Sequence, residues 1–62
     1  MVKMIRIDFI NHHDLATECS TFYRIKATTN KQAIIDAINL FTEQCEQNNK
    51  NFEIIGAYID ND

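Results

Sequence analysis

The densest set of side chains that could do chemistry lies in the amino-terminal third of the chain. It comprises Asn11, His12, His13, Asp14, Glu18 and Cys19. These residue types bind metal ions or transfer protons. Two adjacent histidines are awkward ligands for one metal ion, because neighbouring side chains point apart on a strand and lie about 100° apart on a helix. We expect either polar loop residues or a short helical turn capped by Asn11, and leave open whether the loop binds an ion.

Catalytic chemistry is not supported by the rest of the chain. No Ser or Cys nucleophile is placed by a known motif against the two histidines. The chain has a single Gly, which excludes phosphate-binding loops of the GxGxxG and GxxxxGK types. Cys19 and Cys45 match neither a CxxC motif nor a His/Cys zinc pattern. The sequence therefore predicts a protein that is not an enzyme, with no catalytic residues, no cofactor and no metal site.

The two cysteines also bear on the compartment. A Cys19 to Cys45 disulfide is geometrically possible, since the start of the second strand and the end of the helix predicted below share one end of the domain. Without a secretion signal we expect reduced thiols and a cytoplasmic protein. Apolar runs are only a few residues long, against the ~20 that span a membrane. We therefore expect no membrane association.

Length and composition favour a binding protein. The 62 residues predict one small domain, residues 1–62, near the size limit where association with another chain is a common stabilising aid. The net charge of -3 argues against a general binder of polyanions but permits a local basic patch. Asn, Ile and Lys make up a third of the chain, which is typical of AT-rich genomes and suggests a phage or mobile-element accessory protein.

Three segments show the alternation of apolar and polar residues that is typical of strands. In the first, residues 2–10, Ile5, Ile7 and Phe9 share one face. In the second, residues 21–28, Tyr23 and Ile25 share one face. The third, residues 52–60, is ambiguous: Ile55, Ala57 and Ile59 form one face, and Phe52, Ile54 and Tyr58 form the other.

A helix is predicted between the second and third strands. Thr29 and Gln32 have the spacing of a capping box, in which each residue bonds the other's backbone. From Gln32 to about Gln47, apolar residues cover one side of the helical projection. Two residues break the pattern: Gln44 lies inside the apolar arc and Ile35 just outside it.

These elements predict an α+β fold of ββαβ type, with a mainly antiparallel three-stranded sheet of order 2-1-3 and one helix packed on one face. The order 1-2-3 would need a parallel pair, which small sheets seldom use. The uncovered face is expected to be an interaction surface, with Ile55, Ala57 and Ile59 under the helix. Its predicted members are Met4, Arg6, Phe22, Arg24, Lys26, Phe52, Ile54 and Tyr58.

Two kinds of partner are consistent with that face. The favoured function is a protein-binding module, either a homodimer or an adaptor or inhibitor that docks on a larger host protein. The alternative is a single-stranded nucleic-acid-binding domain, because basic and aromatic side chains interleaved on an open sheet hold phosphates and stack bases. A third reading is a solvated outer face in which Arg6, Asp8, Arg24 and Lys26 form weak ion pairs.

Overall fold

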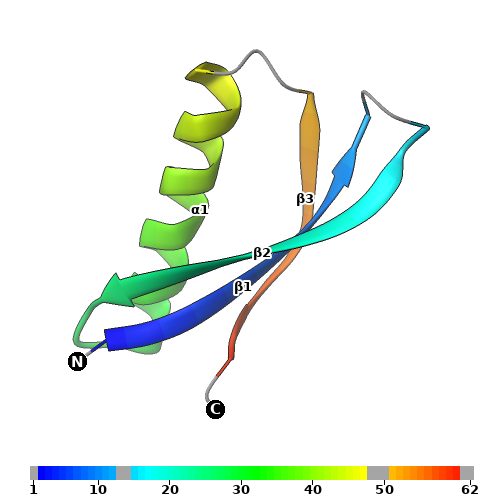
Figure 1. Cartoon of the computed structure of the whole chain (residues 1–62). Helices are drawn as coiled ribbons and strands as arrows, with labels where there is room; N and C mark the ends of the chain where they lie inside the picture. Colours follow the sequence, from blue (N-terminus) through cyan, green and yellow to red (C-terminus); the bar gives the residue numbers. More distant parts are fainter. Residues whose placement is uncertain (1, 13–14, 48–50, 61–62) are drawn as a thin grey trace.

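The computed structural model of the chain describes residues 2–12, 15–47 and 51–60. Its elements follow in the order β1 (Val2–Asn11), β2 (Thr17–Lys26), α1 (Asn30–Gln47) and β3 (Phe52–Ile59). The three strands form one sheet of order β2-β1-β3 in which β1 pairs antiparallel with both neighbours. Figure 1 shows β1 in the middle and α1 packed across the sheet. The predicted ββαβ fold and strand order are confirmed.

The core lies between α1 and the inner side of the sheet. Ile5 and Ile7 of β1 are completely buried, because alternation along the central strand turns them both toward the helix. Ala33 and Ala37 are also completely buried, and their small side chains let α1 approach the sheet closely. Three aromatic rings close one end of this core, with centroids 4.8 to 5.9 Å apart; they belong to Phe9, Phe41 and Phe52.

Only one of the two hydrogen bonds of the predicted capping box forms at the start of α1. The Thr29 hydroxyl accepts a hydrogen bond from the Gln32 backbone N–H at 3.1 Å, which satisfies one of the helix's first amide groups. The Gln32 side chain does not return this bond. Its amide donates instead to Asp36 one turn later, at 2.8 Å. The Thr29 cap is therefore confirmed, and the reciprocal half of the capping box is wrong.

The two residues that broke the helical pattern have different explanations. Gln44 faces the sheet because its side-chain oxygen accepts a 2.6 Å hydrogen bond from the Tyr23 hydroxyl. The hydrogen bond is exposed to solvent and joins α1 to β2 beside the core. Ile35 has no such role and stays 41 % exposed on the outer surface of α1.

The second strand begins four residues earlier than predicted. Residues 17–20 continue the pairing of β2 with β1 as far as Asn11, so the connection is a short hairpin and not a ten-residue loop. Of these residues only Cys19 packs against the core, which is too little alternation to reveal a strand. Leu15 and Ala16, just before β2, have φ angles of 54° and 51°, in the left-handed region that non-glycine residues seldom occupy.

A bulge in β3 decides which of its residues face the core. Asp8 is opposite Gly56, but the next residue, Phe9, is opposite Ile54. One extra residue, Ile55, therefore interrupts the alternation.

On both sides of this bulge β3 presents apolar residues to the core: Phe52, Ile54, Ala57 and Ile59. The expectation that Phe52 and Ile54 lie on the open face is therefore wrong, because the bulge turns both of them inward. Ile55, expected under the helix, is 46 % exposed.

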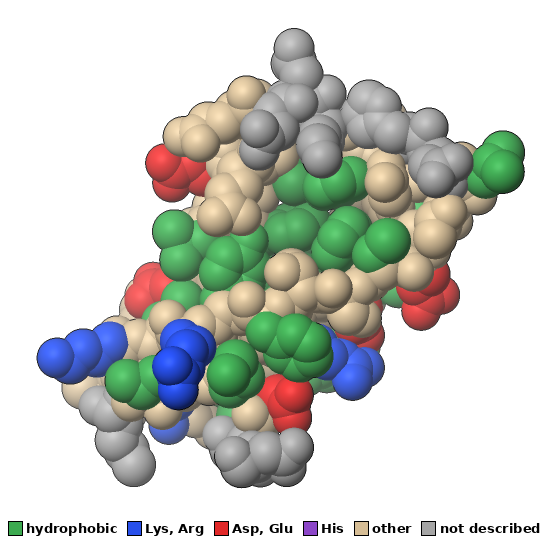
Figure 2. Space-filling view, viewed as in Figure 1, with side chains coloured by type: hydrophobic (Ala, Val, Ile, Leu, Met, Phe, Trp, Pro, Cys, Tyr) green, Lys and Arg blue, Asp and Glu red, His purple; other side chains and the backbone are tan. Residues whose placement is uncertain are grey.

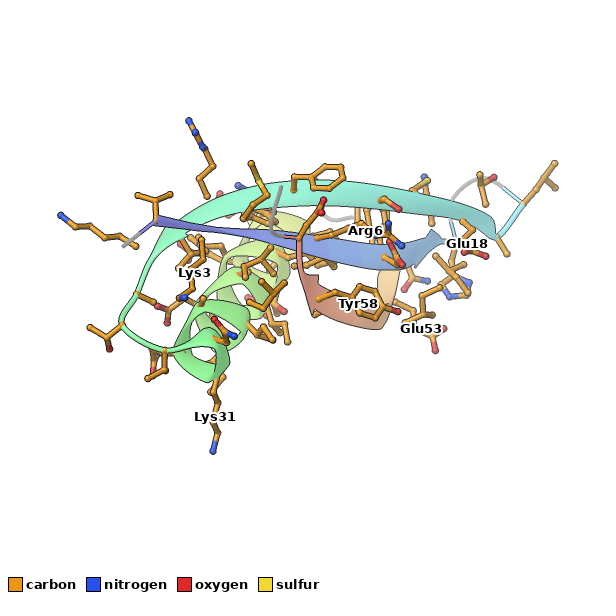
Figure 3. All side chains as sticks on the ribbon, turned by 90° about the horizontal axis from the view of Figure 1, so that it is seen from below. Lys3, Arg6, Glu18, Lys31, Glu53 and Tyr58 are labelled. Carbon is orange, nitrogen blue, oxygen red and sulfur yellow. The ribbon has the colours of Figure 1, made fainter. Side chains whose placement is uncertain are left out.

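The sheet is covered on one side. In the part of the chain drawn in Figure 3, α1 lies on a single side of the sheet. The side chains of Cys19 and Cys45 both pack against the core, and no disulfide joins them. Among the described residues no helix is both long enough and apolar enough to cross a membrane.

Candidate binding face

We call the side of the sheet turned away from α1 the open face. Met4, Arg6 and Asp8 of β1 lie on it, because they alternate with the buried Ile5, Ile7 and Phe9. Their cross-strand partners complete the face; they are Arg24, Phe22 and Ser20 of β2, and Tyr58 and Gly56 of β3. Lys26 joins them opposite Val2. Six of the eight predicted interface residues are thus brought together, and Phe52 and Ile54 are not.

A row of three large side chains crosses the middle of the open face. Arg6 lies directly opposite Phe22 on one side and Tyr58 on the other. Phe22 is 52 % exposed and Tyr58 47 %, which is high for aromatic side chains on a sheet. The Arg6 guanidinium carbon lies 5.5 Å from the centre of the Tyr58 ring, within the range of a cation–π contact. Figure 3 shows Arg6 and Tyr58 reaching toward each other from neighbouring strands.

Arg6 is held in place by a carboxylate on its own strand. Its Nε donates to Oδ1 of Asp8 and its Nη2 donates to Oδ2, both at 3.1 Å, in the bidentate geometry that arginine favours with carboxylates. The Ser20 hydroxyl donates a further bond to Asp8 Oδ1 at 2.7 Å. The hydrogen bonds from Arg6 and then from Ser20 lower the pKa of Asp8 below its ordinary value. The Asp8 side chain is only 13 % exposed, so its charge is largely covered by these partners.

Gly56 makes room for the Tyr58 ring. An added Cβ at Gly56 would lie 2.6 Å from Cζ of the ring, much closer than two carbon atoms can approach. The ring therefore lies back along β3 and covers the backbone beside Asp8, a known way in which an aromatic side chain shields a strand glycine. Tyr58 thereby has a defined position although almost half of it is exposed.

One end of the open face is basic and apolar. Arg24 and Lys26 lie there beside Met4 and Val2, and Val2 is 64 % exposed. Within the described residues neither Arg24 nor Lys26 forms an ion pair with an acidic side chain. Figure 2 shows Lys and Arg side chains next to apolar ones at the end of the sheet where β2 leads into α1. This end can accept acidic groups of a partner.

The histidine segment has a structural role at the opposite end of the sheet. The His12 backbone N–H donates to the carbonyl of Asn51 at 3.0 Å, and its ring Nε2 lies 3.0 Å from a carboxylate oxygen of Glu53. His12 thus joins the end of β1 to the start of β3. His13 and Asp14 lie outside the described residues. Within the described ranges, no three His, Cys, Asp or Glu side chains are grouped in a way that could hold a metal ion.

Two members of the open face, Ser20 and Gly56, were not singled out from the sequence, and Asp8 was expected there only as part of a solvated, ion-paired surface. The sequence holds a signal for Asp8 and one for Gly56. Opposite charges two residues apart on one strand, as in Arg6 and Asp8, share a face and can pair. A single Gly after two consecutive apolar residues, as in the run Ile54, Ile55 and Gly56, indicates a bulge and a close approach of another group.

No protein-family model, curated protein or solved structure matches the chain. Its function must therefore be inferred from the open face itself.

Proposed function

We propose that the chain is a non-enzymatic protein-binding module that docks on a larger protein through its open face. The observation that supports this most is the row of Phe22, Arg6 and Tyr58, in which two exposed aromatic rings flank an arginine that is already ordered. Aromatic and arginine side chains contribute most of the binding energy in protein interfaces. Their arrangement here forms a compact cluster at the centre of the sheet.

The side chains of this row are held in place before binding, which favours high affinity. Arg6 is fixed by Asp8, Asp8 is fixed by Ser20, and Tyr58 is seated over Gly56. Side chains that are ordered before binding lose less conformational entropy when a partner arrives. The hydrogen bonds join β1 to β2 and the cation–π contact adds β3, so a partner meets side chains whose positions are already defined.

The chemistry of the face also describes its partner. The centre of the face matches an apolar or aromatic surface, and Arg24 and Lys26 at one end match carboxylates. The abundance of Asn, Ile and Lys supports an accessory protein of a phage or mobile element. Such a protein would act in the host cytoplasm as an adaptor or as an inhibitor of a host enzyme or defence complex.

The test compares three immobilised proteins in a nuclease-treated lysate: the wild-type chain, a variant with Phe22→Ser and Tyr58→Ser, and the control Ile35→Ser. Ile35 is 41 % exposed on the outside of α1, so the control removes a similar apolar side chain from another surface. The captured protein is then purified and titrated by calorimetry. We expect the control to bind like the wild type and the double variant to bind about a hundredfold more weakly or worse. A partner that binds all three proteins equally would overturn the proposal.

Single-stranded nucleic acid is a second candidate, which the same row supports because Phe22 and Tyr58 could stack bases. Arg24 and Lys26 would then contact phosphates. The charge of Arg6 is already matched by Asp8, and the net charge of -3 weakens the attraction to a polyanion. Fluorescence anisotropy with labelled oligonucleotides separates the two candidates. Salt-sensitive binding that is lost in an Arg24→Glu, Lys26→Glu variant would favour nucleic acid over protein.

A further inference from the structure

We infer that β2 pairs antiparallel with β2 of a second copy of this chain, so that two molecules form one continuous six-stranded sheet. This inference concerns the edge of the sheet and does not rest on the proposed function, but it uses Phe22 and Lys26, whose side chains also lie on the open face. It rests on the regularity of β2, on the backbone groups that β2 presents outward, and on the distribution of charge along it.

The two edges of the sheet differ in regularity. All ten residues of β2 pair with β1 in an unbroken register, and the strand contains neither Pro nor Gly. The other edge strand, β3, is interrupted by its bulge. Bulges protect an edge from joining another sheet, whereas a long, unbroken edge strand presents a row of N–H and C=O groups with which another strand can pair. In the described part of the chain no strand pairs with the outer side of β2.

The direction of the backbone groups of β2 follows from the other side of the sheet. The Met4 carbonyl accepts a hydrogen bond from the Asp60 N–H at 2.8 Å, so Met4 directs its backbone groups toward β3. Backbone groups alternate in direction along an antiparallel strand. Arg6 and Asp8 therefore also point to β3, while Ile5 and Ile7 bond to β2.

The same alternation on β2 leaves every second residue with its N–H and C=O directed outward. These residues are Glu18, Ser20, Phe22, Arg24 and Lys26, the partners of the β1 residues that bond to β3. Their side chains are also the ones on the open face. Opposite residues of an antiparallel pair share a face, so two copies joined here present their open faces on the same side.

The charges along β2 favour the antiparallel orientation. Its first half carries Glu18, and its second half carries Arg24 and Lys26. When two copies pair about a two-fold axis at Phe22, Glu18 lies opposite Lys26 of the second copy and the two Phe22 side chains face each other. A parallel arrangement would bring like charges together. The complementarity repeats on both sides of the axis, which doubles its effect.

The helices leave room for this arrangement. The two β1 strands would be three strand spacings apart, about 14 Å, which exceeds the 8 to 10 Å between packed helices. An open groove of about 400 Å³ lies along this edge, between β2 and α1, and is lined in part by Ile25 and by Leu40, which is 40 % exposed. The first residues of the second β2 strand would form the missing wall of this groove.

Charge reversal tests the register. Glu18→Lys and Lys26→Glu should each weaken the dimer, measured by sedimentation equilibrium, by roughly tenfold, because each places two like-charge pairs across the axis. Combining both substitutions should restore the wild-type dissociation constant. The two positions are about 26 Å apart along one strand, so rescue can only arise between two copies.

Cysteine cross-linking supplies a second measurement, in a chain whose Cys19 and Cys45 are replaced by Ala. Oxidation of a Phe22→Cys variant should give a disulfide-linked dimer, because the two residues would face each other about 5.5 Å apart between Cα atoms. Arg24→Cys, displaced from the axis, should stay monomeric. A chain that sediments as a monomer at every concentration, or a dimer whose cross-links and charge reversals ignore this register, would overturn the inference.

Discussion

The Tyr58 ring lies over Gly56, two residues earlier on the same strand, with Cζ only 2.6 Å from where a Cβ of residue 56 would stand. This close approach of the ring to Gly56 sets how Tyr58 lies on the open face. Because Gly56 has no side chain, the ring can lie back along β3 and still contact Arg6 with its face. The position of the Tyr58 ring therefore depends on Gly56, which has no side chain of its own to contact a partner.

Gly56→Ala should lower the free energy of unfolding by about 1–2 kcal/mol, because the new methyl group forces the ring off the strand. The Tyr58 ring should also become more exposed. Urea denaturation measures the first effect, and quenching of tyrosine fluorescence by iodide measures the second.

A second background serves as the control for this prediction. In a Tyr58→Ala chain there is no ring to displace, so Gly56→Ala should be neutral or stabilise by about 0.5 kcal/mol through reduced backbone entropy of the unfolded chain. Equal destabilisation in both backgrounds would show that the glycine is required for another reason.

Asp8 should make the free energy of unfolding depend on pH in the acidic range. Its pKa is lowered from the ordinary value of 3.8 by the hydrogen bonds from Arg6 and Ser20, so its contribution is complete above about pH 4 and is lost as the pH falls through the folded-state pKa. The free energies of unfolding of the wild type and Asp8→Asn should therefore differ at pH 6 and converge toward pH 2. A difference that stays constant over this range would mean that the pair with Arg6 adds no stability.

The fold was predictable because its strongest signals are local. Alternation identified β1, the apolar arc and Thr29 identified α1, and the preference for antiparallel neighbours gave the strand order. Arg6, Phe22 and Tyr58 were correctly placed on one face by the same alternation.

The errors arose where alternation fails. The bulge at Ile55 reverses the direction of Phe52 and Ile54, and its effect depends on how β3 pairs with β1, which a single strand's pattern does not contain. The first four residues of β2 contain one core-packed side chain, Cys19, so only pairing with β1 defines this part of the strand. The role of Asp8 required knowing that Ser20 lies opposite it on the neighbouring strand.

The bond between Tyr23 and Gln44 can be tested by removing the hydroxyl. Tyr23→Phe should cost up to about 1 kcal/mol, because the hydrogen bond that joins β2 to α1 is lost. Burial and the neighbouring Cys45 raise the pKa of Tyr23, so the wild type should lose stability as the pH rises above about 10, whereas the Phe variant should lose less. Chemical denaturation at pH 7 and at pH 10.5 measures both effects. If the wild type and the Phe variant lost equal stability between pH 7 and pH 10.5, the raised pKa of Tyr23 would not explain the loss.

Ala16, just before β2, has a strained backbone conformation that glycine would relieve. Ala16 has a φ of 51°, which costs a non-glycine residue roughly 1–2 kcal/mol. Ala16→Gly should therefore stabilise the chain by about 0.5 kcal/mol after the extra entropy of the unfolded state is subtracted. Thermal unfolding followed by circular dichroism measures the change, and Glu43→Gly, in the exposed middle of α1, should destabilise by up to about 1 kcal/mol. A lower melting temperature for Ala16→Gly would disprove the strain.

Photo-cross-linking in cells tests most directly whether the open face binds protein. A photoreactive benzoylphenylalanine is introduced at position 22, on the open face, and separately at position 35, on the outside of α1. We predict that upon illumination position 22 forms an adduct with a protein larger than this chain, distinct in mass from a cross-linked pair of copies, and that position 35 does not. Adducts from position 35 alone, or from position 22 to nucleic acid alone, would contradict the account.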